Sequence, residues 1–155
     1  MFFQYIFVIL HILTAAAWFG LALRIVAHAR VALSVDPGAA KVVAGDVSRT
    51  VKLMNVFIIL TLVFALIAFF IGGGFARYTT PYHTSILLLI LLCLDQFYLI
   101  RPATSKLLAA VTAGPVNPAD ATAYRKRLAM ATGIGHTLWV IIIILMFWTS
   151  LFAGM

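Results

Sequence analysis

Four long apolar runs constrain the fold of this chain more than any other feature of its sequence. At a rise of ~1.5 Å per residue, a helix over each run is long enough to cross the ~30 Å hydrocarbon core of a bilayer. With 65% hydrophobic residues, the chain also has too few polar side chains to cover a soluble domain. We therefore expect an all-α fold, an integral membrane four-helix bundle that forms one domain over residues 1–155. Its helices are predicted at about 2–27, 53–73, 82–100 and 130–152.

The positive charges predict how the bundle is oriented. Every Lys and Arg except Arg77 lies beside the first or the third connection between helices, and Arg77 lies in the second. Because cytoplasmic loops collect positive charge, we expect the N and C termini outside and the two basic connections inside. The net charge of +7 then reflects orientation and attraction to anionic membrane lipid, and no separate domain is left to bind nucleic acid. The first run lacks a positive n-region and is too long for a cleavable signal peptide, which fits a multi-pass protein of the bacterial inner (plasma) membrane.

The connections carry recognisable start and stop signals. Asp36-Pro37 is a good helix start, so segment 37–52 is predicted to extend the second helix into the cytoplasm. The short outer connection from Gly72 to Pro81 predicts an antiparallel hairpin of the second and third helices. The third helix is expected to end near Arg101-Pro102. The Gly-Pro and Asn-Pro pairs over 114–118 read as a turn, with Asp120 as a candidate cap for the last helix.

Four histidines are the informative polar residues of the spans. His11 lies slightly outside the middle of the first helix, and His83 at the outer end of the third. His136 lies in the inner half of the fourth helix, and His28 at the inner end of the first. Polar side chains at such depth usually face the bundle interior. Each histidine alone is also explained as an interhelical hydrogen-bonding residue.

An imidazole suits haem iron because one ring nitrogen donates a lone pair while a neighbour holds the other ring N–H. Cys93 is the only cysteine, which excludes a covalent Cys-x-x-Cys-His haem site and leaves haem b as the candidate cofactor. We expect His11 and His83 as the axial pair in the outer half. His136 with His28 is the candidate for a second haem in the inner half.

Three further residues extend the candidate site. Trp18 lies two helical turns below His11 on the same face, and it either serves as a packing and interface anchor or packs against the cofactor. Arg24 either snorkels to the inner interface or binds a carboxylate such as a porphyrin propionate. Asp95 is the only acid within a span, and an unpaired charge there costs ~2.5–3.5 kcal/mol. We expect it to form an ion pair or hydrogen bond with Arg24, Arg101 or a histidine, or to serve as a proton relay.

The first helix resembles a known family. The stretch from His11 to Gly20, followed by Arg24 and His28, resembles the first helix of HemJ-type protoporphyrinogen oxidases and of the wider group of small CopD-like four-helix membrane proteins. Arg49, Thr61 and the Tyr82-His83 pair are similar to later positions of the same pattern. This chain departs from it at Asp95, Gln96 and Tyr98, where those proteins usually carry a further histidine, and at His136, which lies outside the pattern. The resemblance implies haem b and redox chemistry.

These observations favour a haem b protein that carries out intramembrane electron transfer, with a quinone- or porphyrin-linked oxidoreduction as its chemistry. A HemJ-like protoporphyrinogen oxidase is the first alternative. A transporter of copper or another small solute is the second, although Met54, Met130, Met146 and Cys93 do not form a closely spaced soft-ligand cluster. A non-catalytic subunit of a larger membrane complex is the third. A homodimer is a reasonable assembly because four helices make a thin wall around a large cofactor.

Overall fold

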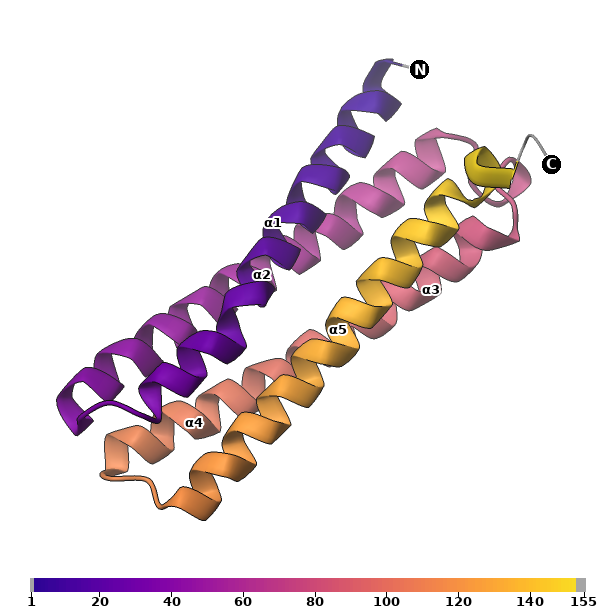
Figure 1. Ribbon diagram of the computed structural model, residues 1–155. Coiled ribbons are helices and arrows are strands. Elements are labelled where there is room, and N and C mark those ends of the chain that lie inside the picture. Colours follow the sequence, from indigo (N-terminus) through magenta and orange to yellow (C-terminus); the bar gives the residue numbers. More distant parts are fainter. Residues whose placement is uncertain (1, 153–155) are drawn as a thin grey trace.

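The computed structural model describes residues 2–152 of the chain, with side chains through residue 148. This part of the chain forms helices joined by short turns and contains no strand (Figure 1). The elements in chain order are α1 (Phe2–Ala32), α2 (Pro37–Ile71), the 3₁₀ turn η1 (Gly74–Ala76), α3 (Thr80–Asp95), the π turn η2 (Gln96–Ile100), α4 (Arg101–Ala113) and α5 (Pro118–Phe152). Helices α3, η2 and α4 run on as one rod, so the chain has four helices that are long and apolar enough to cross a membrane. The predicted four-helix membrane bundle is confirmed.

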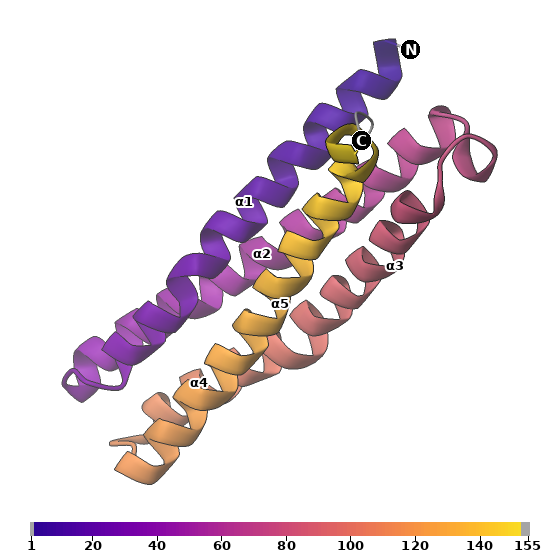
Figure 2. The ribbon, with the colours of Figure 1, turned by 45° about the vertical axis from the view of Figure 1, so that its right-hand side comes forward.

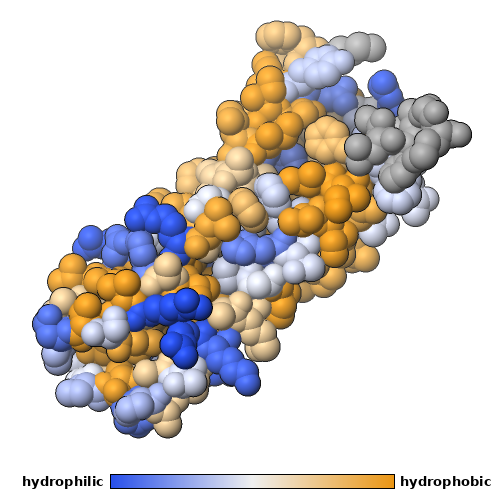
Figure 3. Space-filling model, viewed as in Figure 1, coloured by the Kyte–Doolittle hydropathy of each residue, from blue (hydrophilic) through white to orange (hydrophobic). Residues whose placement is uncertain are grey.

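The start of α1 and the end of α5 lie at the same end of the bundle, and the α1–α2 and α4–α5 turns lie at the other (Figure 1). Following the predicted orientation, we call the first the outer end and the second the inner end. Hydrophilic side chains gather at the inner end, while apolar side chains dominate the rest of the visible face (Figure 3). The helices extend beyond the predicted spans at the inner end, since α1 runs to Ala32 and α2 starts at Pro37.

Helices α1 and α2 pack along most of their length. The buried positions of α1 recur at steps of three or four residues, as in the seam of a coiled coil. They are His11, Thr14, Trp18, Ala22, Ile25, Ala29 and Ala32. The buried positions of α2 have a similar spacing over the same length and are Ala40, Ala44, Val47, Val51, Met54, Ile58 and Thr61. Alanines on both sides of the seam near the inner end let the two backbones approach closely.

The predicted start of α2 is confirmed. The Asp36 carboxylate accepts hydrogen bonds from the backbone N–H groups of Gly38 (3.0 Å) and Ala39 (3.1 Å), and Pro37 occupies the first turn. This cap satisfies N–H groups that have no partner within the helix. Segment 37–52 is therefore the inner part of one continuous helix.

The third rod does not end at Arg101-Pro102, which corrects the prediction from the sequence. Proline lacks an N–H and its ring clashes with the preceding turn of an α-helix. Here a wider π turn over Gln96–Ile100 precedes Pro102, and the Arg101 N–H donates to the Gln96 carbonyl five residues back. The rod continues as α4 to Ala113 and stops at Gly114, whose φ is +145°.

The turn predicted over 114–118 is confirmed, but the cap of α5 differs from the expectation. The Asn117 side-chain oxygen accepts the Asp120 backbone N–H at 2.8 Å, and the Asn117 amide donates back to the Asp120 carboxylate. Asn117 is therefore the capping residue, and Asp120 lies in the first turn that it caps.

The four rods pair unevenly. Helix α1 packs mainly on α2, and α3 packs mainly on α5. Helix α2 contacts α4 near the inner end but has little contact with α3, although the Gly72–Thr79 segment joins α2 and α3 directly. The two views show α2 and α3 running antiparallel while diverging toward the outer end (Figures 1 and 2). This divergence creates the candidate site.

Candidate cofactor site

A cleft opens between the rods in the outer half of the bundle. Four elements and the α2–α3 turn contribute to its walls, and nearly all of its lining is apolar or aromatic. The enclosed volume of this cleft is about 90 Å³, and the cleft opens from there to the surroundings. We call it the outer cleft. Its lining residues are Val8, His11, Ala65, Ala68, Phe69, Tyr78, Tyr82, Ser85, Ile86, Leu89, Ile142 and Met146.

His11 is the one histidine of the outer cleft. Its side chain is 7% exposed, and its Nδ1 lies 3.0 Å from the backbone carbonyl oxygen of Thr61 on α2. A carbonyl only accepts, so Nδ1 carries the proton and donates it, and the lone pair of the neutral ring lies on Nε2. Residues 2–148 offer no hydrogen bond to Nε2. Histidines that bind metals usually have this arrangement, in which the second ring N–H donates to a carbonyl and fixes the tautomer.

The acceptor of this hydrogen bond is itself fixed by a small polar cluster beneath the cleft. The hydroxyls of Thr14 and Thr61 lie 3.0 Å apart across the α1–α2 seam, and both residues are buried. Thr14 also donates to the Leu10 carbonyl, and Thr61 approaches the Phe57 carbonyl at 2.7 Å. These contacts tie α1 to α2 at the depth of His11 and hold the imidazole in one orientation.

His83, the expected second ligand, does not line the outer cleft. Its ring meets Phe69 edge-on at a centroid distance of 6.0 Å and packs against Phe75 at 5.1 Å. Its Nε2 is buried and has no hydrogen-bond partner among the described residues. The structure therefore does not bring His11 and His83 together, and the neighbour of His83, Tyr82, takes a place in the wall instead.

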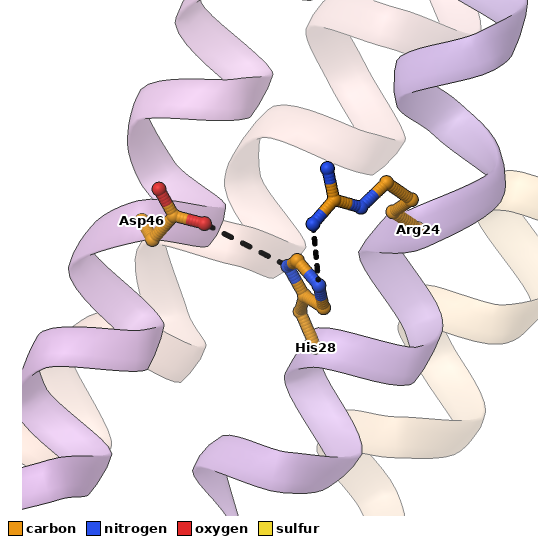
Figure 4. Close-up of polar contacts among 3 residues, drawn as sticks. All are labelled: Arg24, His28 and Asp46. Atoms are coloured by element: carbon orange, nitrogen blue, oxygen red, sulfur yellow. Dashed lines mark hydrogen bonds and ion pairs between the residues drawn. The ribbon is translucent and has the colours of Figure 1, made fainter.

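His28 takes part in a different cluster at the inner end of α1 (Figure 4). The Arg24 guanidinium lies 3.2 Å from His28 Nε2, and the Asp46 carboxylate lies 3.7 Å from His28 Nδ1. Because Arg24 can only donate, Nε2 accepts and the N–H of Nδ1 faces Asp46. Both ring nitrogens are thereby engaged, Nε2 by a contact within α1 and Nδ1 by a contact between α1 and α2.

His136 does not lie near His28. Its ring packs on Phe19 of α1 at a centroid distance of 5.0 Å, and Phe19 stacks on Trp139 at 4.0 Å. Phe19 lies nine residues from His28, or about 13 Å along the helix. The structure therefore does not assemble the second expected pair. His136 Nε2 is buried without a hydrogen bond in the described part of the chain.

Arg24 and Trp18 also lie outside the outer cleft. Arg24 is 13 residues from His11, about 20 Å along α1, so it cannot reach a porphyrin held by His11. It borders a small recess between α1 and α2 instead. Trp18 is fully buried, and its ring N–H donates to the Gln96 side chain at 3.0 Å, which in turn donates to Asn55 at 2.7 Å.

Asp95 lies beside this chain of hydrogen bonds at the start of the π turn. It is 4% exposed, and neither of its side-chain oxygens has a hydrogen-bond partner among the side chains described. Arg24 and Arg101, its expected partners, are both exposed. The ion pair expected from the sequence is not observed within residues 2–148.

Sequence reasoning missed several residues of the outer cleft. Met146, Tyr78, Tyr82 and Ser85 are half-buried or buried and belong to its walls. The spacing of Ile142 and Met146 by four residues places both on one face of α5, but nothing in the sequence indicates that this face meets His11. The Gln4 amide donates to the Tyr78 hydroxyl at 2.7 Å and links α1 to the outer turn beside the cleft.

The cleft offers one imidazole, and the surrounding chain offers no bare-metal site. In the part of the chain with described side chains, no three His, Cys or Asp residues come close enough to hold a metal ion. A free zinc or copper ion usually takes three or four protein ligands. Haem iron is already held by the four nitrogens of the porphyrin and takes only axial ligands from the protein. The outer cleft therefore offers the Nε2 atom of one imidazole as a candidate metal ligand. No family model, curated protein or solved structure matches this chain.

Proposed function

We propose that this protein is a b-type membrane cytochrome, in which His11 ligates haem iron in the outer cleft and the protein passes electrons within the membrane. The observation that carries the proposal is the hydrogen bond from His11 Nδ1 to the Thr61 carbonyl, which leaves Nε2 free to bind a metal in an apolar cleft. The resemblance of the first helix to haem-binding families points to the same cofactor.

The walls suit a flat apolar group. Ala65, Ala68 and Ser85 are small and leave room, while Phe69 and Tyr82 supply aromatic surface. Haem supplies one-electron redox chemistry when bound. The protein would hold it through His11, whose imidazole is oriented by the Thr61 carbonyl, and the apolar walls would limit the access of water; both features would influence the potential of the iron.

Two residues are candidates for the second axial position. Met146 lines the outer cleft together with His11. His83 has an unused ring nitrogen but packs against Phe69 and Phe75, so it would have to leave these contacts to reach the cleft. We therefore propose Met146, which lines the cleft together with His11, as the second ligand in place of the His83 expected from the sequence.

The proposed partner is a lipid-soluble redox molecule, a quinone or a porphyrin. The cleft is partly open, and its lining is apolar enough for such a molecule to approach from the bilayer. With the basic connections inside, the haem would lie in the outer half of a bacterial inner membrane. Turnover of protoporphyrinogen by the purified protein would add catalytic oxidation to this role.

The test is the haem content of protein purified in mild detergent, with His11→Ala compared with His28→Ala. Both variants lose one imidazole from α1, but His28 lies about 25 Å from His11 along the helix. We expect a b-type spectrum in the wild type and in His28→Ala, and loss of haem in His11→Ala. A wild-type haem content in His11→Ala, or a colourless wild type with intact helices, would contradict the proposal.

A further inference from the structure

Asp95 is buried within the membrane-spanning rods and has no hydrogen-bond partner among the described side chains. Its side chain is 4% exposed, and both carboxyl oxygens are shielded and lack a hydrogen bond in the described part of the chain. The chain has four acidic residues, and the other three, Asp36, Asp46 and Asp120, are exposed near the inner end. Asp95 is thus the one carboxyl that the fold places in an apolar interior.

The neighbouring helices are shaped around this carboxyl. A Cβ atom at Gly135 on α5 would lie 2.9 Å from Oδ2 of Asp95 and 3.2 Å from the Trp18 ring. A side chain at Gly135 would therefore take the space that the carboxyl occupies. The nearby donors point elsewhere, since the Trp18 N–H is bonded to Gln96 and the Gln96 amide to Asn55.

Among the described residues, no ion pair to Asp95 is formed from the elements around it. Helix α1 presents Trp18, with Arg24 six residues further along and exposed. On α2 the nearest polar residue is Asn55, which accepts a hydrogen bond from Gln96. On α5 Gly135 faces the carboxyl, and the ring of the next residue, His136, packs on Phe19. On the rod that carries Asp95, Arg101 is exposed. The described surroundings thus supply neither a counter-charge nor a donor to the carboxyl.

We propose that Asp95 is a proton-binding site in the membrane interior. A buried carboxylate without partner is costly, whereas the neutral acid needs no counter-charge, so the packed state accommodates Asp95 with its proton. Binding joins one proton from water to one carboxylate oxygen, and no electron moves. Release of the proton leaves a carboxylate, which needs a hydrogen-bond donor or water to reach it. The π turn over Gln96–Ile100 directly follows Asp95, and it is the segment where the winding of the rod departs from an α-helix. This proposal does not depend on haem at His11.

Infrared difference spectroscopy of the protein in lipid nanodiscs, titrated with pH, tests the proposal. The carbonyl stretch of a protonated carboxylic acid is distinct from the bands of a carboxylate. We expect an acid band at neutral pH in the wild type that disappears in Asp95→Asn and persists in Asp46→Asn. Asparagine has nearly the shape of a neutral aspartic acid, so Asp95→Asn should keep the packing. Carboxylate bands alone at neutral pH in the wild type would overturn the proposal.

A labelling experiment gives a second readout that needs no variant. Dicyclohexylcarbodiimide reacts with protonated carboxyls in apolar surroundings. The carboxyl proton moves to one carbodiimide nitrogen, and the carboxylate oxygen bonds to the central carbon to give an O-acylisourea. The acyl group then migrates from this oxygen to a nitrogen, which leaves a stable N-acylurea. Because the chain has only four carboxyl side chains, peptide mass spectrometry assigns every adduct. We expect the adduct at Asp95, with a yield that falls as pH rises. Labelling of the three exposed aspartates but not of Asp95, together with an absent acid band, would refute the site.

Discussion

The inner and outer halves of the bundle are built on different principles. In the inner half, α1 and α2 close on each other through alanines such as Ala22, Ala29 and Ala44, all at most 1% exposed. In the outer half, α2 and α3 diverge although a short turn joins them, and the outer cleft lies between the rods. Small residues on both sides of a seam allow the two helix backbones to approach closely. Where small residues face bulky ones, the backbones stay further apart and space is left between the helices. Chain connection alone does not decide which helices pack.

The polar residues follow the same division. In the outer half, His11 keeps one ring nitrogen free beside a cleft. In the inner half, both nitrogens of His28 are engaged, by Arg24 and Asp46. The same residue type on the same helix therefore suits ligand binding in one half and helix pairing in the other.

The largest expected effect comes from overfilling the inner seam with Ala22→Leu. Ala22 is fully buried, and three added carbon atoms have no space between α1 and α2. We expect a loss of about 1–3 kcal/mol in stability, measured by thermal or denaturant unfolding in detergent. Ala27→Leu makes the same change on an exposed position of α1 and is the control. Equal stability of the two variants would show that the inner half is not tightly packed.

The matched change in the outer half is Ala68→Leu, which fills the cleft. We expect haem affinity to fall about tenfold, or ~1.4 kcal/mol, with less effect on helix stability than Ala22→Leu has. Val63→Leu, on an exposed position of α2, serves as the control. The measurement is the haem-to-protein ratio during titration with haemin. Undiminished haem binding in Ala68→Leu would place the cofactor elsewhere.

Met146→Leu sharpens the assignment of the outer site. Methionine as an axial ligand raises the potential of haem iron relative to histidine. Removing it should lower the midpoint potential by about 60 mV, a tenfold change in a one-electron equilibrium, while haem stays bound to His11. Redox titration followed by absorption measures this shift, with His83→Ala as the comparison. A shift in His83→Ala and none in Met146→Leu would restore the His–His pair.

The smallest effect is expected from Thr61→Val, at the border between the two halves. It removes the hydroxyl that faces Thr14 but keeps the backbone carbonyl that accepts from His11. Interhelical hydrogen bonds in membranes average about 0.6 kcal/mol, so stability should fall by about that amount and haem content should not change. Loss of haem in this variant would mean that the hydroxyl, and not the carbonyl, positions the imidazole.

The sequence predicted what depends on local signals. The four spans follow from apolar length, the start of α2 from Asp36-Pro37, and the turn before α5 from its Gly-Pro and Asn-Pro pairs. The prediction that the third helix ends near Pro102 was wrong because a π turn accommodates this proline. The sequence gives no sign of that adjustment.

The candidate site was only partly predictable. The depth of His11 could be read from its position in the first span. Its hydrogen bond to Thr61 and its cleft shared with Met146 could not, because they depend on which helices pair and how each is rotated. The same limit explains why the predicted histidine pairs are not found. The position of a residue along its helix gives its depth in the membrane, but not the direction in which its side chain points.

Rescue of His11→Gly by free imidazole is the most direct test of the central claim, that His11 ligates haem iron. The glycine variant leaves a space of the size of the missing ring, so added imidazole can take the place of the lost ligand. We predict that His11→Gly purifies without its b-type spectrum and regains it when haemin and imidazole are supplied together. Under the same conditions imidazole should leave His28→Gly unchanged. A wild-type spectrum in His11→Gly without imidazole would contradict the account.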